Sequence, residues 1–482
     1  MLQIFKKNTS LLAISLLLYF PSMGQDKEVW SLADCVNQAL SKNISVQQQI
    51  LSTQSARYDL TQSKLALLPT LNLNANNNWQ TGFAINPTTN NAQENVSFRT
   101  NSFGLGGSVP VFAGFQNINN VKVKEALLKA SLKDLEQSKN TITLNVCNAY
   151  LRVLQSIELY QSSIDRIQAT KAQVDRQQKM FELGSSNKSR FLQLKAQLSN
   201  EELAMVNAQN TLNQAYLELW LLIEIKPEPN YKIEKPNTQD LNIADEPRSI
   251  DDIFDLFSNN SPDIAAAEWR TKGAQIQNQI AKGGYSPRLN LNGNLNSFFT
   301  TQSQIGVGNL NFTNTLIGAG ELNGSVIPVF ANRPVGYDDY IVTPFNTQFN
   351  RNFGSNIGLN LSIPIFNGGT IHNNVQKSQI SHQSNKLNEK LTKNNLYRSI
   401  AQSYVDFKAS FKRFDANKIN LEANKEAFEI SEKQFELGGL SIADYLNSKN
   451  AYIRAEADYT QAKYELVFRR KVLDFYLGKP LY

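Results

Sequence analysis

The stretch Ile363-Pro-Ile-Phe-Asn-Gly-Gly369 repeats the pattern of Val109-Pro-Val-Phe-Ala-Gly114, which lies 254 residues earlier in the chain. Both stretches follow an alternating polar and apolar segment and precede a long helical pattern. Proline lacks a backbone N–H and glycine tolerates unusual backbone angles, so this combination is typical of a sharp change from strand to helix. The repetition indicates that the chain contains two copies of one unit.

The duplication extends over most of the sequence. Ser31 and Ser249 open two matching segments that are 218 residues apart, whereas the strand-to-helix stretches are 254 residues apart. The second copy therefore carries an insertion before its strand-to-helix stretch. We predict repeat 1 at residues 25–225, a linker rich in proline and charge at 226–248, and repeat 2 at 249–482.

Composition excludes several classes of protein. The 482 residues include only 2 Cys and 2 His, too few for a disulfide scaffold or a thiolate metal site. Cys35 and Cys147 lie in helical patterns among apolar neighbours, and we expect both to be buried thiols. The net charge of +6 is small and dispersed, which argues against a nucleic-acid partner. No phosphate loop, nucleophile elbow or metal-ligand spacing occurs, so we expect no enzyme activity, catalytic residue, metal or cofactor.

The N-terminus has the pattern of a secretory signal peptide. Lys6 and Lys7 precede the apolar stretch Leu11–Phe20, and Ser22-Met-Gly24 resembles a cleavage site. We therefore predict a signal peptide at residues 1–24 and an exported mature chain. No apolar run of 18 residues occurs elsewhere, so a membrane crossing would have to be made by strands.

Predicted strands alternate apolar residues with asparagine. Leu71 and Leu73 in the first copy, and Leu289 and Leu291 in the second, are each followed by Asn. This alternation suits a strand with one face toward lipid and one uncharged wet face, but a half-buried sheet in a soluble protein shows it too. We expect strands at about 69–80, 103–112, 287–299 and 353–366, with polar loops at about 81–102 and 300–352.

Long helical patterns follow the strands. The first spans 70 residues, 114–183, which is about 105 Å of helix. Its apolar residues step by four and three with one extra step of four, as in a locally straightened coiled coil. Each copy is therefore predicted to be an antiparallel coiled coil in which two shorter helices run beside the long one. The second long helix is expected at 368–437, and return helices at 189–225 and 441–477.

Four strands cannot close a barrel, and an open sheet edge is not viable in lipid. If these strands span a membrane, several chains must share one barrel, and two, three or four chains would supply eight, twelve or sixteen strands. The predicted fold class is mainly α with membrane β: a tandem-duplicated protomer of long coiled-coil helices plus four β-strands.

The set of duplicated motifs resembles the TolC-like outer membrane efflux protein (outer membrane factor) family. Besides the strand-to-helix stretches, it includes Trp30-Ser-Leu-Ala-Asp-Cys-Val-Asn-Gln-Ala-Leu40 and the Phe-Glu-Leu-Gly turns at 181–184 and 435–438. The resemblance covers nearly all of the mature chain and implies a homotrimer with a trimeric 12-stranded β-barrel, continued by a periplasmic α-helical tunnel. It also implies three partners, namely a periplasmic adaptor (membrane fusion) protein, an inner-membrane transporter and outer-membrane lipid.

The resemblance assigns the turns between the helices to the far end of the tunnel. Gly184 and Gly438, with Leu183 and Leu437 before them, are expected to form the adaptor-docking tips. A purely structural interpretation is also open, because glycine permits the left-handed backbone that ends a helix.

The resemblance also assigns a tunnel constriction. Asp444 occupies the position of an inward-facing acidic ring, and Asn447 and Arg190 stand where similar proteins often have further acids. The family's closure partners correspond here to Phe435 and Leu440, so an Arg190–Asp444 contact is a separate hypothesis. Alternatively, Asp444 only stabilises the N-terminus of its helix.

Prolines mark all four predicted junctions between strand and helix. We expect a structural role for them and for the glycines beside them: Pro69, Pro110, Pro287, Pro364, Gly114, Gly368 and Gly369.

The expected function is that of an outer-membrane exit duct in a tripartite efflux or type I secretion system. Such a duct would pass substrates from the adaptor and transporter to the cell exterior, lying in the outer membrane and extending into the periplasm. The alternative is an elongated exported coiled-coil structural or adhesive protein with a soluble β head. The sequence names neither the substrate nor the transporter class.

Overall fold

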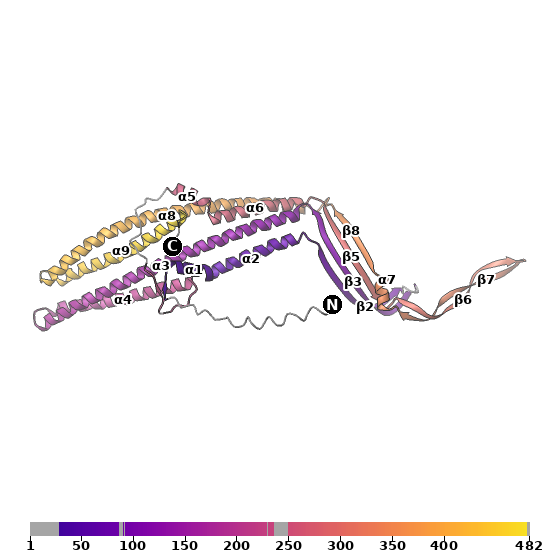
Figure 1. The fold of residues 1–482 in the computed structure, drawn as a ribbon, viewed down its shortest axis with the longest axis horizontal. Helices are drawn as coiled ribbons and strands as arrows, with labels where there is room; N and C mark the ends of the chain where they lie inside the picture. Colours follow the sequence, from indigo (N-terminus) through magenta and orange to yellow (C-terminus); the bar gives the residue numbers. More distant parts are fainter. Residues whose placement is uncertain (1–27, 86–89, 91, 229, 236–248, 480–482) are drawn as a thin grey trace, which may run out of the picture. The chain divides into compact units, whose positions relative to one another are not determined.

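A computed structural model of the chain describes residues 28–85, 90, 92–228, 230–235 and 249–479 (Figure 1). The predicted signal peptide and part of the predicted linker lie outside these residues. The described chain forms two compact units, and each takes segments from both sequence repeats. The helical unit comprises the described parts of residues 1–55, 129–269 and 386–482, and the sheet unit comprises those of 56–128 and 270–385.

Long helices occur in matching pairs in the two repeats. In the first repeat the helices are α1 (Leu32–Lys42), α2 (Ile44–Leu65), α3 (Gln116–Glu182) and α4 (Lys188–Leu222). In the second they are α5 (Ile250–Ser258), α6 (Pro262–Gly283), α8 (Thr370–Glu436) and α9 (Ile442–Tyr476). The long helices α3 and α8 have 67 residues each, and the return helices α4 and α9 have 35 each. Of the helices in the described part of the chain, none combines the length and apolarity needed to cross a membrane.

The first helix of each repeat starts with the same local signal. Ser31 accepts a hydrogen bond from the backbone N–H of Asp34, whose carboxylate accepts one from the backbone of Ser31, which completes a capping box. In the second repeat Ser249 accepts from the N–H of Asp252 in the same way. These caps fix where α1 and α5 begin.

The helical unit contains a core for each repeat. In the first, Val36, Val146 and Trp220 are buried together, and the short parallel strands β1 (Val29–Trp30) and β4 (Lys232–Ile233) lie beside them. In the second, Ile253 and Ile400 are fully buried in the equivalent cluster. Cys35 and Cys147 are buried and form no disulfide, which confirms the prediction for both.

The sheet unit contains one antiparallel four-stranded sheet in the order β2-β3-β5-β8. Its strands are β2 (Thr70–Ile85), β3 (Ala92–Ala113), β5 (Arg288–Thr300) and β8 (Gly354–Ser362). The predicted polar loop at 81–102 is wrong for most of its length, because β2 and β3 continue pairing as far as Ile85 and Ala92. The sequence-predicted strand at 353–366 ends earlier, at Ser362.

The strand register separates two kinds of side chain. One row across the four strands shares a single face of the sheet. It consists of Asn72, Gly106, Asn294 and Asn356, each opposite the next. The other face carries the rows that include Leu73, Leu105 and Leu295. A Cβ atom on Gly106 would come within 3.3 Å of the side-chain oxygen of Asn294, so glycine leaves room for the amide across from it.

The predicted loop at 300–352 is also wrong. It folds into a hairpin of β6 (Gln304–Leu322) and β7 (Ser325–Val342), followed by the short helix α7 (Phe345–Arg351). The hairpin turns at Asn323 and Gly324, whose φ angles are 54° and 77°. Two central residues with positive φ form a type I′ turn, which matches the twist of the strands on either side.

Helix α7 covers the edge of β5 beyond the end of its pairing with β8. Gln348 is buried, and its side-chain amide accepts from the N–H of Thr300 and donates to the carbonyls of Thr300 and Thr343. The rings of Phe345 and Phe349 pack edge-to-face on Phe103. The side chain of Gln348 therefore takes the place of a neighbouring strand there.

Candidate functional site

The two turns between the long and return helices have the same backbone geometry. Gly184 and Gly438 have φ angles of +72° and +81°. After Gly184, Ser185 donates its N–H to the carbonyl of Met180, and after Gly438, Gly439 donates to that of Gln434. These hydrogen bonds and left-handed glycines form the motif that ends a helix. Both glycines therefore have the structural role that the sequence left open, which is to end a helix in the left-handed backbone conformation.

Leucine side chains project into solvent at both turns. Leu183 is 82% exposed and Leu437 is 88% exposed, and each directly follows the last residue of its long helix. Nothing in the described residues covers either side chain. Each helix pair therefore presents a small apolar surface at its turn, formed by one exposed leucine.

Asp444 takes part in the N-cap of α9. Ser441 accepts from the N–H of Asp444 at 3.2 Å and donates its hydroxyl to the Asp444 carboxylate at 2.6 Å. Asp444 is exposed, as is Asn447 one turn further along the helix. Asp444 therefore has the geometry of a first-turn acid that stabilises the N-terminus of its helix. Its carboxylate also remains accessible to solvent.

Arg190 does not make the contact with Asp444 that the sequence suggested as a hypothesis. Its guanidinium donates to the backbone carbonyl of Leu440 at 2.9 Å and lies 4.7 Å from the centre of the Phe435 ring. Arg190 belongs to the first turn of α4, whereas Phe435 and Leu440 flank the turn between α8 and α9. The arginine therefore links the first repeat to the turn of the second, through a carbonyl and a ring instead of a carboxylate.

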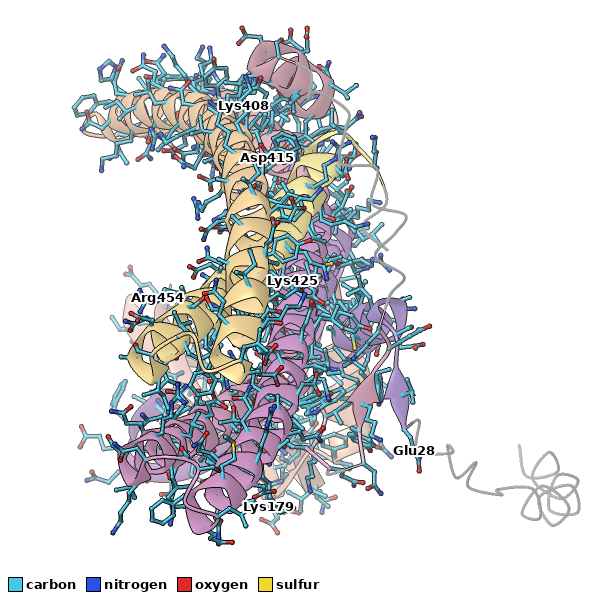
Figure 2. The ribbon with its side chains drawn as sticks, turned by 90° about the vertical axis from the view of Figure 1, so that its left-hand side faces the viewer. Glu28, Lys179, Lys408, Asp415, Lys425 and Arg454 are labelled. Carbon is cyan, nitrogen blue, oxygen red and sulfur yellow. The ribbon has the colours of Figure 1, made fainter. Side chains whose placement is uncertain are left out.

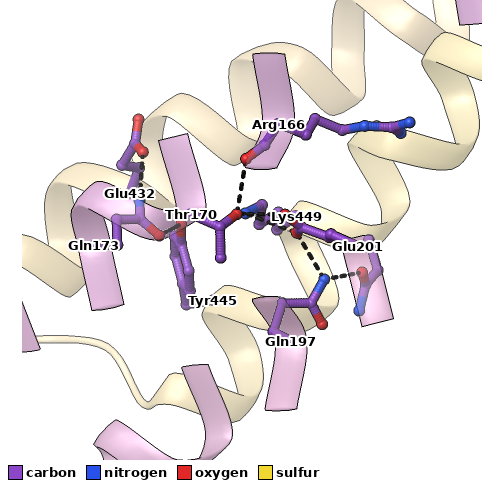
Figure 3. A network of polar contacts seen from close by, with 9 residues as sticks. Arg166, Thr170, Gln173, Gln197, Glu201, Glu432, Tyr445 and Lys449 are labelled. Carbon is purple, nitrogen blue, oxygen red and sulfur yellow. Dashed lines mark hydrogen bonds and ion pairs between the residues drawn. The ribbon is translucent and has the colours of Figure 1, made fainter. Parts of the chain in front are cut away.

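A buried ion pair lies further along α9 (Figure 3). Lys449 and Glu201 are 2.9 Å apart, with side chains only 6% and 7% exposed. The hydroxyl of Thr170 contacts both of them, and Gln197 donates to Glu201 at 2.9 Å and to Asn450 at 3.2 Å. Charges buried this deeply need such complete pairing, because desolvation costs several kcal/mol per ion, roughly. The network joins α3, α4 and α9.

A second polar chain lies beside the ion pair. The hydroxyl of Tyr445 donates to Gln173 at 2.6 Å, and Gln173 donates to Glu432 at 3.0 Å. Tyr445 is fully buried and stacks on Phe435 with ring centres 4.5 Å apart. Burial raises the pKa of Tyr445, and burial together with nearby Glu436 raises the pKa of Glu432. This chain joins α9, α3 and α8 (Figure 3).

A groove of about 610 Å³ opens next to these two networks. Most of its walls come from α3, α8 and α9, and Lys235 adds to them. The lining combines acids, bases and aromatic rings: Glu158, Asp165, Glu432, Glu456, Arg166, Lys449, Phe428 and Tyr452. No group of three or more His, Cys, Asp or Glu that could hold a metal ion occurs within the described residues. The groove therefore presents charged side chains and aromatic rings on which a planar group could stack.

The predicted junction residues lie where the strands meet the helices, with one exception. Pro69 and Pro287 directly precede β2 and β5, and Pro364 follows β8. Pro110 instead lies inside β3, at a register shift in its pairing with β5.

The junction glycines all have left-handed φ angles, which are +59° for Gly114, +62° for Gly368 and +77° for Gly369. At Gly114 a Cβ atom would come within 2.3 Å of the carbonyl of Gly283, so this position also needs glycine for space.

Sequence reasoning missed the buried Lys449–Glu201 pair. One signal was available, because Tyr445, Lys449 and Tyr452 are spaced by four and three and so share a helix face. A lysine in an otherwise aromatic stripe indicates a buried cation that needs a partner. Nothing in the sequence identifies that partner as Glu201 of the other repeat.

Comparison with known proteins identifies relatives by sequence pattern and by fold. The family model described as "Outer membrane efflux protein" matches residues 35–223 and 254–479. No curated protein matches the chain.

Several solved structures are similar in fold. The crystal structures of CusC that concern folding and transmembrane channel formation are 16% identical, with a TM-score of 0.74 over 93% of this chain and 92% of that one. The CmeC outer membrane channel of Campylobacter jejuni is 18% identical, with a TM-score of 0.70 over 92% and 84%. The outer membrane protein VceC of Vibrio cholerae is 16% identical, with a TM-score of 0.70 over 94% and 97%. At these identities the structures show a shared fold, and the family match over both repeats shows that this chain belongs to the outer membrane efflux protein family.

Proposed function

We propose that three copies of this chain form one exit duct of a tripartite efflux or type I secretion system. The duct passes substrates from a periplasmic adaptor and an inner-membrane transporter to the cell exterior. The observation that carries this proposal is the four-stranded sheet. It has one apolar face, one asparagine face and two outer strands that, within the described chain, pair on one side only.

The outer strands β2 and β8 are suited to pairing between copies. Among the described residues, β2 pairs only with β3, and β8 pairs only with β5. Because the sheet is antiparallel throughout, β2 and β8 run in opposite directions, and β8 of one copy can extend the sheet antiparallel to β2 of the next. This head-to-tail contact closes into a ring, and three copies supply an even number of strands, twelve.

The two sheet faces suit the two sides of a barrel wall. Leu71, Leu73 and Ile357 are exposed on the apolar face of the single chain, and lipid would cover them in the membrane. Asn72 and Asn74 on the opposite face would line the bore. Neutral amides hold water without fixing ions, so this wall admits hydrated cargo of either charge.

The helix turns are the proposed contacts with the adaptor. Leu183 and Leu437 expose apolar surface at equivalent turns, so an adaptor can cover both. In a trimer the exposed carboxylate of Asp444 would occur three times around one axis, with Asn447 beside it and Arg190 on the neighbouring helix pair. Three carboxylates at a constriction favour cations over anions.

Mass and conductance measurements test the duct. We expect a detergent-extracted trimer that conducts ions in a planar bilayer. A detergent-independent monomer without conductance would overturn the proposal and favour the elongated structural protein.

Asp444→Asn tests the constriction and should lower the preference for cations. Asp415→Asn removes the same charge from the surface of α8, where Figure 2 shows it, and is the matched control. Equal effects of the two variants would contradict an acidic ring at Asp444.

A further inference from the structure

The hairpin β6–β7 forms a sheet of its own. Its strands have 19 and 18 residues, and neither pairs with another strand among the residues that the structure describes. At about 3.3 Å per residue each strand is roughly 60 Å long. A two-stranded hairpin is only marginally stable in water, and its outer edges offer backbone groups to any further strand.

The two outer edges of the hairpin are not equivalent. Leu322 lies opposite Ser325 across the two-residue turn at Asn323-Gly324. In a hairpin closed by a type I′ turn this pair is a hydrogen-bonded one, so alternate residues of β7, counted from Ser325, point their N–H toward β6. Pro328 and Pro334 fall on the other alternation, so the N–H groups that they lack belong to the outer edge of β7. The sequence of β6 contains no proline. The outer edge of β7 is therefore interrupted twice by proline, whereas that of β6 contains no proline and, between Phe312 and Glu321, has one bulge, at Ile317.

The open edge of β6 also lacks the usual protection by charge. In the regular stretch from Phe312 to Leu316, Phe312 and Leu316 lie on one face with Phe330 of β7, and all three are exposed. Glu321 is the only charged residue of β6. Natural proteins normally protect an exposed edge with lysine, proline or a covering helix. The outer edge of β7 has two prolines, whereas β6 has neither lysine nor proline, and its regular stretch from Phe312 to Leu316 has no bulge.

We propose that the outer edge of β6, from Phe312 to Glu321, binds an extended peptide segment of another protein as an additional strand. Backbone N–H and C=O groups along this edge require a partner with matching groups, which lipid chains do not have. A second copy stacked head-to-tail would need the outer edge of β7, which Pro328 and Pro334 interrupt. The bound segment is largely uncharged, with alternating apolar residues and a basic residue opposite Glu321.

Asn314 and Asn332 supply matched variants. They lie directly opposite each other, Asn314 on β6 and Asn332 on β7, and both point their N–H groups away from the hairpin. Asn314→Pro removes one donor from the proposed binding edge. Asn332→Pro removes the equivalent donor from the edge that prolines already interrupt. Neither change removes a hydrogen bond between β6 and β7, so both variants keep the hairpin.

The test measures binding of a synthetic peptide to the full-length protein in detergent. The probe is a fluorescent peptide of alternating valine and threonine with an arginine near its N-terminus, which lies opposite Glu321 in an antiparallel complex. We expect saturable binding, weakened about tenfold by Asn314→Pro and unchanged by Asn332→Pro. A peptide with N-methylated backbone amides controls for adsorption to apolar surface and should not bind.

Three outcomes would overturn the strand-addition site. Binding of the N-methylated peptide as tight as that of the probe would show apolar adsorption only. Equal effects of Asn314→Pro and Asn332→Pro would show that the two edges do not differ. Concentration-dependent association of the protein that Asn314→Pro abolishes, measured by mass photometry, would show that β6 pairs with β6 of a second copy.

Discussion

Lys449→Met breaks the buried ion pair with little change in side-chain volume. It removes the cation that lies 2.9 Å from Glu201 and leaves a carboxylate that is 7% exposed. Glu201 keeps the hydrogen bonds from Thr170 and Gln197, which stabilise the remaining charge only in part. The variant therefore isolates the free energy of an unpaired buried carboxylate.

The expected loss of stability follows from the depth of the pair. Removing one partner of a buried ion pair costs about 3–5 kcal/mol, and the two remaining donors place this case near the lower end. A loss of about 3 kcal/mol corresponds to a local opening equilibrium shifted roughly a hundredfold. A second change, Glu201→Gln in the same chain, removes the charge and should recover most of this loss.

Hydrogen–deuterium exchange read by mass spectrometry measures this local stability. Backbone amides of α4 around Glu201 and of α9 around Lys449 should exchange up to about a hundredfold faster in Lys449→Met. They should exchange at close to the native rate in the double variant. Unchanged exchange in the single variant, or equally fast exchange in both, would refute the buried charge as the cause.

Three further changes test other features of the fold. Gly438→Ala should cost about 1–2 kcal/mol of stability in a thermal melt, because φ is +81° there, whereas Gly439→Ala should be nearly neutral. Because the pKa of Glu432 is raised in the folded state, this residue stabilises the fold when the pH is below 4.5, the ordinary pKa of glutamate. The stabilisation is lost as the pH rises through the raised pKa. Glu432→Gln should therefore increase stability at neutral pH and remove that part of the pH dependence, and a parallel pH profile would contradict this. Gln348→Leu leaves the N–H of Thr300 without its acceptor and should cost roughly 1–3 kcal/mol. Exchange at Thr300 that stays slow would contradict that role.

The duplicated strand-to-helix stretch was enough to locate the long helices, because proline and glycine restrict the backbone locally. The alternation of Leu71 and Leu73 with asparagine also gave the two sheet faces before any register was known. The hairpin β6–β7 was missed although Asn323-Gly324 is a strong turn signal. Bulges, such as that at Ile317, break the alternation that would have shown two strands.

Contacts between the two repeats could not be predicted from local pattern. Arg190 donates to the backbone carbonyl of Leu440, and a carbonyl carries no sequence signal. The partner of Lys449 depends on how two coiled coils pack, which side-chain spacing within one helix does not determine. Local sequence therefore indicates the long helices and the four-stranded sheet, whereas the polar network between the helices depends on how they pack in three dimensions.

The two buried cysteines have a practical consequence for studying this chain. Burial raises the pKa of Cys147 to about 11, so almost none of it is thiolate at neutral pH, and Cys35 is fully buried. Maleimide labels need an accessible thiolate, so the two native cysteines should not react with them. A single cysteine introduced at Leu183 or Leu437 would then be the sole labelled position, and spectroscopic probes could follow either helix turn in an otherwise unaltered protein.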